Sequence, residues 1–218
     1  INVDSNALLD FFVQALSSML TEAKHEIRPK SVVSIIVSDR LGVISALPWQ
    51  DTSMTQTELN SFAIYWLAKY GVKIDASHLL FADYPRYQEI GIVYALPRVF
   101  VESLASVVEH ENLNLDRIIP LSAAVFYSEH LKKMKSSTCI VCEETHSLSS
   151  WICDQEGKLH YEVEPVTATY DVAMRRLLAK IYARYDELGQ FDFWGFARRS
   201  PTETLASALF SNLPTSFG

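Results

Sequence analysis

The apolar residues of this chain follow two spacings, which predict an alternation of helices and strands. Between residues 5 and 24, apolar side chains recur every three or four positions, as on one face of a helix. Residues 31–37 read SVVSIIV, a run rich in the β-branched residues that favour strands. Both patterns recur along the rest of the sequence, which therefore predicts a mixed α/β fold.

Capping and turn residues set the ends of the predicted elements. Thr55 and Glu58 have the spacing of a capping box, and Gly71 suits the end of the helix that follows. Pro97 and Pro201 stand where first helical residues are expected. Strands are predicted at 31–37, 43–47, 79–82, 90–96, 117–119, 138–143, 149–153, 159–163 and 191–196. Helices are predicted at 5–24, 56–70, 97–111, 122–135, 169–189 and 201–211.

The order of these elements divides the chain near residues 135–138. Residues 137–218 give strand, strand, strand, helix, strand, helix, which is the order of a ribonuclease H-like subdomain. Two such subdomains in tandem make the actin-like ATPase fold. Residues 1–136 are then expected to form a first actin-like subdomain that lacks its opening strands. The first residue is Ile1 and not Met, so we expect the chain to be an excised fragment.

Two stretches carry a resemblance to a known family. Residues 31–49, SVVSIIVSDRLGVISALPW, and the block that opens at residue 90 with IGIVYALPRVF resemble pilus assembly proteins of the PilM type and the L-type protein of type II secretion. The resemblance implies an actin-like scaffold at the cytoplasmic face of an inner-membrane pilus or secretion machine. Such scaffolds link a motor ATPase to the membrane platform.

Composition narrows the choice of ligand and compartment. The 218 residues include 26 acidic and 19 basic ones, with a formal net charge of -7. Nucleic acid is therefore not expected as a ligand, because phosphate binding needs a basic face. No apolar run is long enough to span a bilayer, so membrane contact is expected only through a segment outside this chain. Three cysteines and no signal peptide favour the cytoplasm.

The turn at which an actin-like ATPase would hold a phosphate lacks glycine here. Glycine lets backbone amides close around a phosphate without a Cβ in the way. The expected turn reads Glu143-Glu-Thr-His-Ser147, and its two carboxylates would repel a phosphate. We therefore predict a non-catalytic protein with no cofactor. The alternative is a degenerate actin-like ATPase or sugar-kinase-like enzyme, which would bind nucleotide with magnesium.

The cysteines and histidines do not predict a metal site. Cys139 and Cys142 form a Cys-x-x-Cys pair, but residues three apart on a strand point to opposite faces. Cys153 stands alone on the next predicted strand. All three are predicted to be reduced thiols in the core. The six histidines have no metal-ligand spacing, and we recognise no catalytic constellation.

Two segments are candidates for partner contact. The loop at residues 83–89 carries Tyr84, Arg86 and Tyr87, and Tyr and Arg are enriched among interface hot spots. The predicted final helix presents Leu205, Leu209 and Phe210. The competing interpretation of the loop is an ordinary surface loop with exposed aromatics. Together these patterns predict a scaffold that recruits the motor ATPase or a platform membrane protein.

Overall fold

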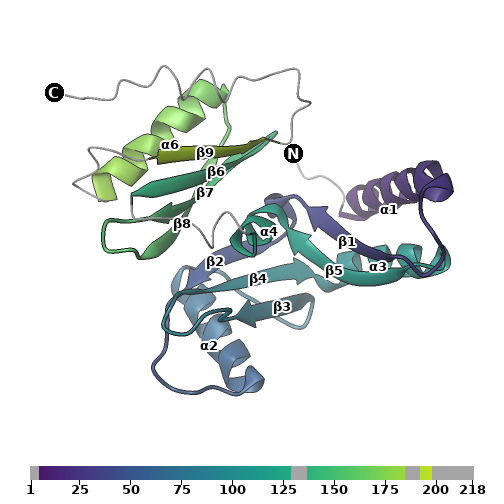
Figure 1. Cartoon of the computed structure of the whole chain (residues 1–218), viewed down its shortest axis with the longest axis horizontal. Helices are drawn as coiled ribbons and strands as arrows, with labels where there is room; N and C mark the ends of the chain where they lie inside the picture. The colour runs from purple at the N-terminus through teal and green to yellow at the C-terminus, as the bar shows by residue number, and fades with distance from the viewer. Residues whose placement is uncertain (1–4, 129–136, 185–191, 198–218) are drawn as a thin grey trace.

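The computed structural model describes residues 5–128, 137–184 and 192–197, and these form three sheets flanked by helices (Figure 1). The helices are α1 (Ser5–Glu22), α2 (Gln56–Lys69), α3 (Arg98–His110), α4 (Leu121–Phe126) and α6 (Tyr170–Arg184). The strands are β1 (Val32–Val37), β2 (Val43–Leu47), β3 (His78–Asp83), β4 (Gly91–Pro97), β5 (Asn114–Pro120), β6 (Thr138–Glu144), β7 (Ser147–Cys153), β8 (Leu159–Pro165) and β9 (Asp192–Ala197).

The C-terminal part, residues 137–184 and 192–197, has the predicted order of three strands, a helix and a strand. Its sheet runs β8-β7-β6-β9, with β6, β7 and β8 antiparallel and β9 parallel to β6. Cys139 packs beneath α6 against Leu177, whereas Cys142 belongs to the central core on the other face. The prediction that the two thiols point to opposite faces is confirmed, and all three cysteines are buried and free.

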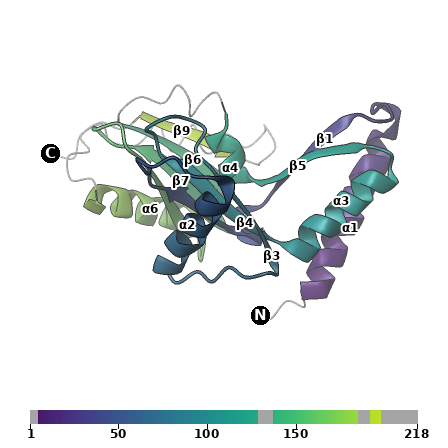
Figure 2. The same ribbon diagram turned by 90° about the horizontal axis from the view of Figure 1, so that it is seen from below.

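The N-terminal part, residues 5–128, contains a parallel pair of strands, β1 and β5. Helices α1 and α3 lie side by side on one face of this pair (Figure 2). Phe12 of α1 meets Phe100 of α3 edge to face, with ring centroids 5.5 Å apart. The other face of β1 is open: Val32 is 71% exposed and Ile36 is 53% exposed.

A small sheet with the order β2-β4-β3 lies between β1 and α3 in the sequence. Its central strand β4 alternates cleanly. Val93 packs under α2 with Leu59 and Leu67, whereas Ile92 and Leu96 enter the central core. Helix α2 begins at the predicted capping box of Thr55 and Glu58. The small sheet therefore has α2 on one face, and on the other face its central strand packs into the central core.

One central core joins all three sheets. Helix α4 lies in the middle of the molecule, between the C-terminal sheet and the β1–β5 pair (Figure 1). Its Phe126 packs against Trp151 of β7, with ring centroids 5.0 Å apart, and Trp151 is fully buried. Tyr161 of β8 also packs against Trp151, with ring centroids 4.8 Å apart. The division at residues 136 and 137 stays a prediction, since residues 129–136 lie outside the described residues.

Several boundaries differ from the sequence prediction. Strands β6 and β7 extend until Glu144 pairs with Ser147, so the turn between them is only Thr145-His146. Helix α3 begins at Arg98, one residue after the expected Pro97. The predicted helix at 201–211, with Leu205, Leu209 and Phe210, falls outside the described residues. No helix within the described ranges is long and apolar enough to cross a membrane.

The packing of α6 predicts that substitutions on its two faces change the free energy of unfolding by very different amounts. Leu177→Ala should lower the free energy of unfolding by about 2–5 kcal/mol, because it leaves a cavity under the helix. Arg175→Ala, on the exposed face of the same helix, should change it by less than about 0.5 kcal/mol. Urea unfolding followed by circular dichroism measures both. Equal effects would contradict the position of α6 on the sheet.

Candidate functional site

Polar side chains from both parts of the molecule meet beside α4. Asp39, in the turn after β1, accepts hydrogen bonds from the Ser122 backbone N–H (2.9 Å) and from the Ser122 Oγ–H (2.5 Å). Its carboxylate also accepts one from Ser149 Oγ of β7, at 3.0 Å. The two serine hydroxyls are themselves 2.6 Å apart. We call Asp39, Ser122 and Ser149 the Asp39 clamp.

Further contacts surround the clamp. Glu144, almost fully buried at the end of β6, accepts the Asp39 backbone N–H at 3.1 Å. Trp151 Nε1 donates to the Ser122 carbonyl at 2.9 Å. The Tyr161 hydroxyl lies 3.3 Å from Ser122 Oγ. The turn of β6 and β7 is thus held to the N-terminal part by polar contacts.

Strand register explains why these side chains converge. Glu144 pairs with Ser147, and Cys142 pairs with Ser149, so all four lie on one face of the β6–β7 hairpin. Alternate residues of a strand share a face. That face turns toward α4, and the polar residues occupy its end near the turn. The opposite face packs under α6 mainly through apolar side chains such as Val141, Leu148 and Ile152.

The chemistry of this junction does not suit phosphate. Two carboxylates, Asp39 and Glu144, lie where the fold brings the turn of β6 and β7 against the N-terminal part. A phosphate there would meet like charge. Ser122 is fully buried, so its hydroxyl does not face solvent. Burial, with the nearby Asp39 charge, raises the pKa of Cys142 to about 12, which keeps this thiol protonated.

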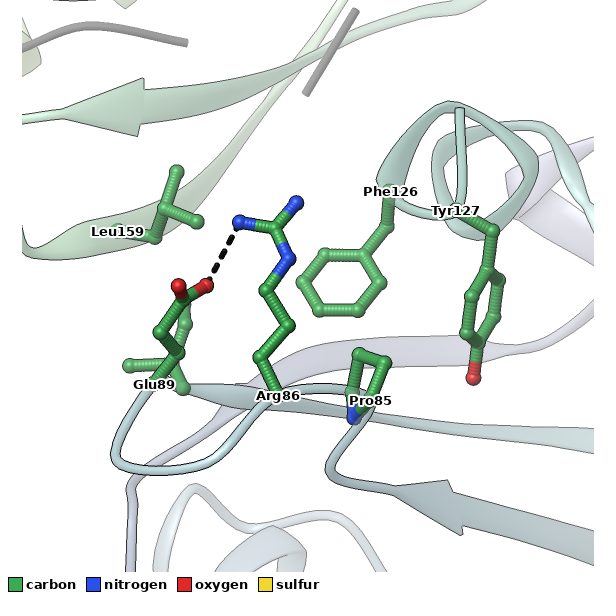
Figure 3. A pocket seen from close by; sticks show the side chains of 7 residues that line it. Pro85, Arg86, Glu89, Phe126, Tyr127 and Leu159 are labelled. Carbon is green, nitrogen blue, oxygen red and sulfur yellow. Dashed lines mark hydrogen bonds and ion pairs between the residues drawn. The ribbon is translucent and has the colours of Figure 1, made fainter. Parts of the chain in front are cut away.

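The loop between β3 and β4, predicted as a partner contact, lies beside a small pocket (Figure 3). Arg86 reaches between Leu159 of β8 and Phe126 of α4, and its Nη1 pairs with Glu89 Oε2 at 2.7 Å. The cavity is about 30 Å³, enough for about one water molecule. It is far too small for a nucleotide, so it fits at most the tip of a partner side chain.

The structure gives the two tyrosines of this loop different environments. Tyr84 donates its hydroxyl to the Pro48 carbonyl at 2.5 Å and meets Trp49 edge to face at 5.2 Å. Burial raises the pKa of Tyr84 to about 12. Its ring also leaves no room for a Cβ at Gly91. Tyr87 also meets Trp49 edge to face, at 5.3 Å, but it is 80% exposed. Tyr84 therefore holds the loop in place, and Tyr87 is available to a partner.

A second exposed aromatic group was missed by the sequence analysis. Phe81 of β3 stacks on Tyr94 of β4, with ring centroids 4.9 Å apart and planes at 18°. The Tyr127 hydroxyl, just after α4, donates to Asp83 at 3.1 Å. Arg117 of β5 interacts electrostatically with both tyrosines. Burial raises the pKa of Tyr94 and of Tyr127, so both stay neutral.

This group continues onto the open face of β1. Ser34 pairs with Arg117 in the β1–β5 register, and Ser34 Oγ donates to Asp116 at 2.9 Å. Val32 and Ile36 share the outward face of Ser34 because they alternate with it along the strand. We call Val32, Ile36, Phe81, Arg117 and Tyr127 the aromatic surface. It joins β1, β3, β5 and the end of α4.

Only weak sequence signals marked these residues. Serines inside the apolar run Ser147–Cys153 and the carboxylate of Glu144 at the end of a strand were signs of a polar contact. No local sequence signal identified Asp39 as the residue that these serines contact. Phe81 lies in a short predicted strand, and there an aromatic side chain predicts a core position as readily as a surface one.

Solved structures with the same fold include the following three. No protein-family model matches the sequence, and no curated protein is similar to it. The PilM-PilN type IV pilus biogenesis complex superposes with a TM-score of 0.55 at 16% identity, covering 96% of this chain and 73% of that one. The cytoplasmic domain of EpsL, an inner-membrane component of the Vibrio cholerae type II secretion system, superposes with a TM-score of 0.52 at 10% identity. The match covers 86% of this chain and 68% of that one.

A third similar structure is a Bacteroides thetaiotaomicron protein with an actin-like ATPase fold and unknown function. It gives a TM-score of 0.54 at 12% identity, covering 89% of this chain and 72% of that one. The chain therefore has the actin-like fold predicted from the order of its elements. The resemblance to PilM-type and L-type proteins is confirmed at the level of the fold.

The charge at the junction predicts that ATP does not bind. Calorimetric titration of ATP with magnesium should give no heat beyond dilution, because Asp39 and Glu144 oppose a phosphate there. Titration of magnesium alone is the control. A dissociation constant of about 1 µM, which corresponds to a binding free energy of about -8 kcal/mol, would contradict the prediction and favour the degenerate-ATPase alternative.

The two loop tyrosines should differ in their effect on stability. Tyr84→Ala should lower the free energy of unfolding by about 2 kcal/mol or more, through lost burial and the lost hydrogen bond to the Pro48 carbonyl. Tyr87→Ala, the matched control from the same loop, should cost less than about 1 kcal/mol. Thermal and urea unfolding provide the measurement. If Tyr84→Ala left the free energy of unfolding unchanged, the ring of Tyr84 would not anchor the loop.

Proposed function

We propose that this protein is a non-catalytic scaffold of a pilus or type II secretion machine, which binds a partner protein on its aromatic surface. The observation that carries the proposal is the open outer face of the parallel β1–β5 pair, on which Val32 and Ile36 are exposed. Parallel sheets are normally covered on both faces. An apolar face left bare on such a sheet favours a partner that covers it.

The residues around this face suit a polypeptide ligand. Phe81 and Tyr127 offer aromatic contacts, and Arg117 and Asp83 lie beside them for polar ones. Among the described residues, β1 pairs with β5 alone, so one edge of β1 has no strand beside it. An extended segment bound along that edge would gain backbone hydrogen bonds and place alternate side chains on the aromatic surface.

The fold neighbours support the class of partner. PilM was solved in a complex with PilN, a protein of type IV pilus biogenesis, and EpsL is an inner-membrane component of a secretion system. By this analogy the present protein works at the cytoplasmic face of the inner membrane and links the motor ATPase to a platform protein. Arg86 and Tyr87 form a secondary contact in this proposal, and Leu205, Leu209 and Phe210 of the predicted final helix are a further candidate.

Substitutions on the aromatic surface should weaken partner binding without unfolding the protein. Phe81→Ala combined with Val32→Ser should cost about 2 kcal/mol or more of binding free energy, a loss of hot-spot size. Calorimetry against the cytoplasmic segments of the pilus or secretion proteins encoded beside this protein is the measurement.

Tyr65→Ala is the matched control, because Tyr65 is a 67% exposed aromatic on α2, away from this surface. The Tyr65→Ala variant should bind the partner with the same affinity as the unmodified protein. If the double variant is folded and binds with undiminished affinity, the partner does not use the aromatic surface, and the contact shifts to Arg86 and Tyr87. If none of the neighbouring proteins binds the unmodified chain, the scaffold proposal itself is wrong.

A further inference from the structure

The Asp39 clamp connects parts of the chain that share no strand pairing. Asp39 and Ser122 belong to the N-terminal part, and Ser149 belongs to β7 of the C-terminal part. Among the described residues, β1 to β5 pair with one another and β6 to β9 pair with one another, but no ladder joins the two groups. The relative position of the two parts therefore depends on side chains.

The clamp is directional, whereas the core around it is not. Apolar contacts such as Phe126 with Trp151 tolerate small rotations of one part against the other. A carboxylate that accepts three hydrogen bonds allows one geometry, and bonds to a charged acceptor are about twice as strong as neutral ones. Rotating the parts would break the bond from Ser149 to Asp39 and the bond from Trp151 to the Ser122 carbonyl, and losing these bonds in a partly buried site is costly.

Helix α4 extends the effect of the clamp across the molecule. The Ser122 N–H and Oγ bond to Asp39, and the Ser122 carbonyl accepts from Trp151, so the start of α4 is bound from both parts. The other end of α4 carries Phe126 at the pocket and Tyr127 at the aromatic surface. Fixing the start of so short a helix also fixes these two rings.

We propose that Asp39 locks the two parts of this protein in a single closed arrangement, and through α4 holds the rings of Phe126 and Tyr127 in place. Opening and closing between the two parts is then not part of how this protein works. The lock is a property of the fold alone, and it stands or falls independently of which partner the aromatic surface binds.

Hydrogen exchange followed by mass spectrometry tests the lock in the intact chain. Asp39→Ala should raise exchange of the amides in residues 121–128 by more than about tenfold, because a charged hydrogen-bond acceptor is removed. Ser149→Ala removes one bond from the side of the C-terminal part and should raise the same exchange to a smaller extent. Small-angle scattering should give a larger radius of gyration for Asp39→Ala.

The matched control is Ser150→Ala. Ser150 is fully buried on the same strand as Ser149 but faces α6. It should leave residues 121–128 as protected as in the unmodified protein. If Asp39→Ala does not fold, comparing the exchange of residues 121–128 in Ser149→Ala and Ser150→Ala tests the lock instead. Equal exchange in these two variants would overturn the lock, and so would an exchange increase in α6 as large as that in 121–128, which would indicate general loss of stability.

Discussion

The half-buried carboxylate of Asp39 needs hydrogen-bond donors, and this protein supplies them from two separate parts of the chain. The backbone N–H and hydroxyl of Ser122 come from the start of α4, and the hydroxyl of Ser149 comes from β7. An enclosed acceptor without donors costs more than a made hydrogen bond gains. That asymmetry makes the contact selective. The two parts pack through a broad apolar core, and the clamp chooses one geometry from those that the core would tolerate.

The same junction does not suit a phosphate ligand. In the fold shared with actin-like ATPases, the turn of β6 and β7 approaches the N-terminal part. Here Glu144 at that turn accepts the backbone N–H of Asp39, and Asp39 accepts from the serines. Negative side chains thus use donors at the meeting point of the two parts. The arrangement stabilises the contact, and it opposes an anionic ligand for the same electrostatic reason.

The remaining surface divides into a covered side and an open one. Helices α1 and α3 cover one face of the β1–β5 pair, and α2 covers one face of the small sheet. The opposite face of β1 presents Val32 and Ile36 to solvent. A bare apolar face on parallel strands raises the free energy of the isolated protein relative to a complex that covers it. This difference is the physical basis of the proposed scaffold role.

Local sequence determined the elements and their faces. The capping box of Thr55 and Glu58 marked the start of α2, and the spacing of Cys139 and Cys142 placed them on opposite faces of β6. These features depend on neighbouring residues, whose backbone geometry is the same in any fold. The order of three strands, a helix and a strand then indicated the actin-like architecture.

Only the tertiary structure decided which distant residues meet. Asp39 lies 83 residues before Ser122 and 110 before Ser149. No local sequence pattern shows that these residues come into contact. Tyr84 and Tyr87 look alike in the sequence and both contact Trp49, yet Tyr84 is half-buried and bonds to the Pro48 carbonyl, whereas Tyr87 is exposed. Phe81 became a surface residue because β3 is the edge of its sheet. Periodicity reports which face a side chain occupies, whereas the identity of its neighbour across that face depends on how whole sheets pack.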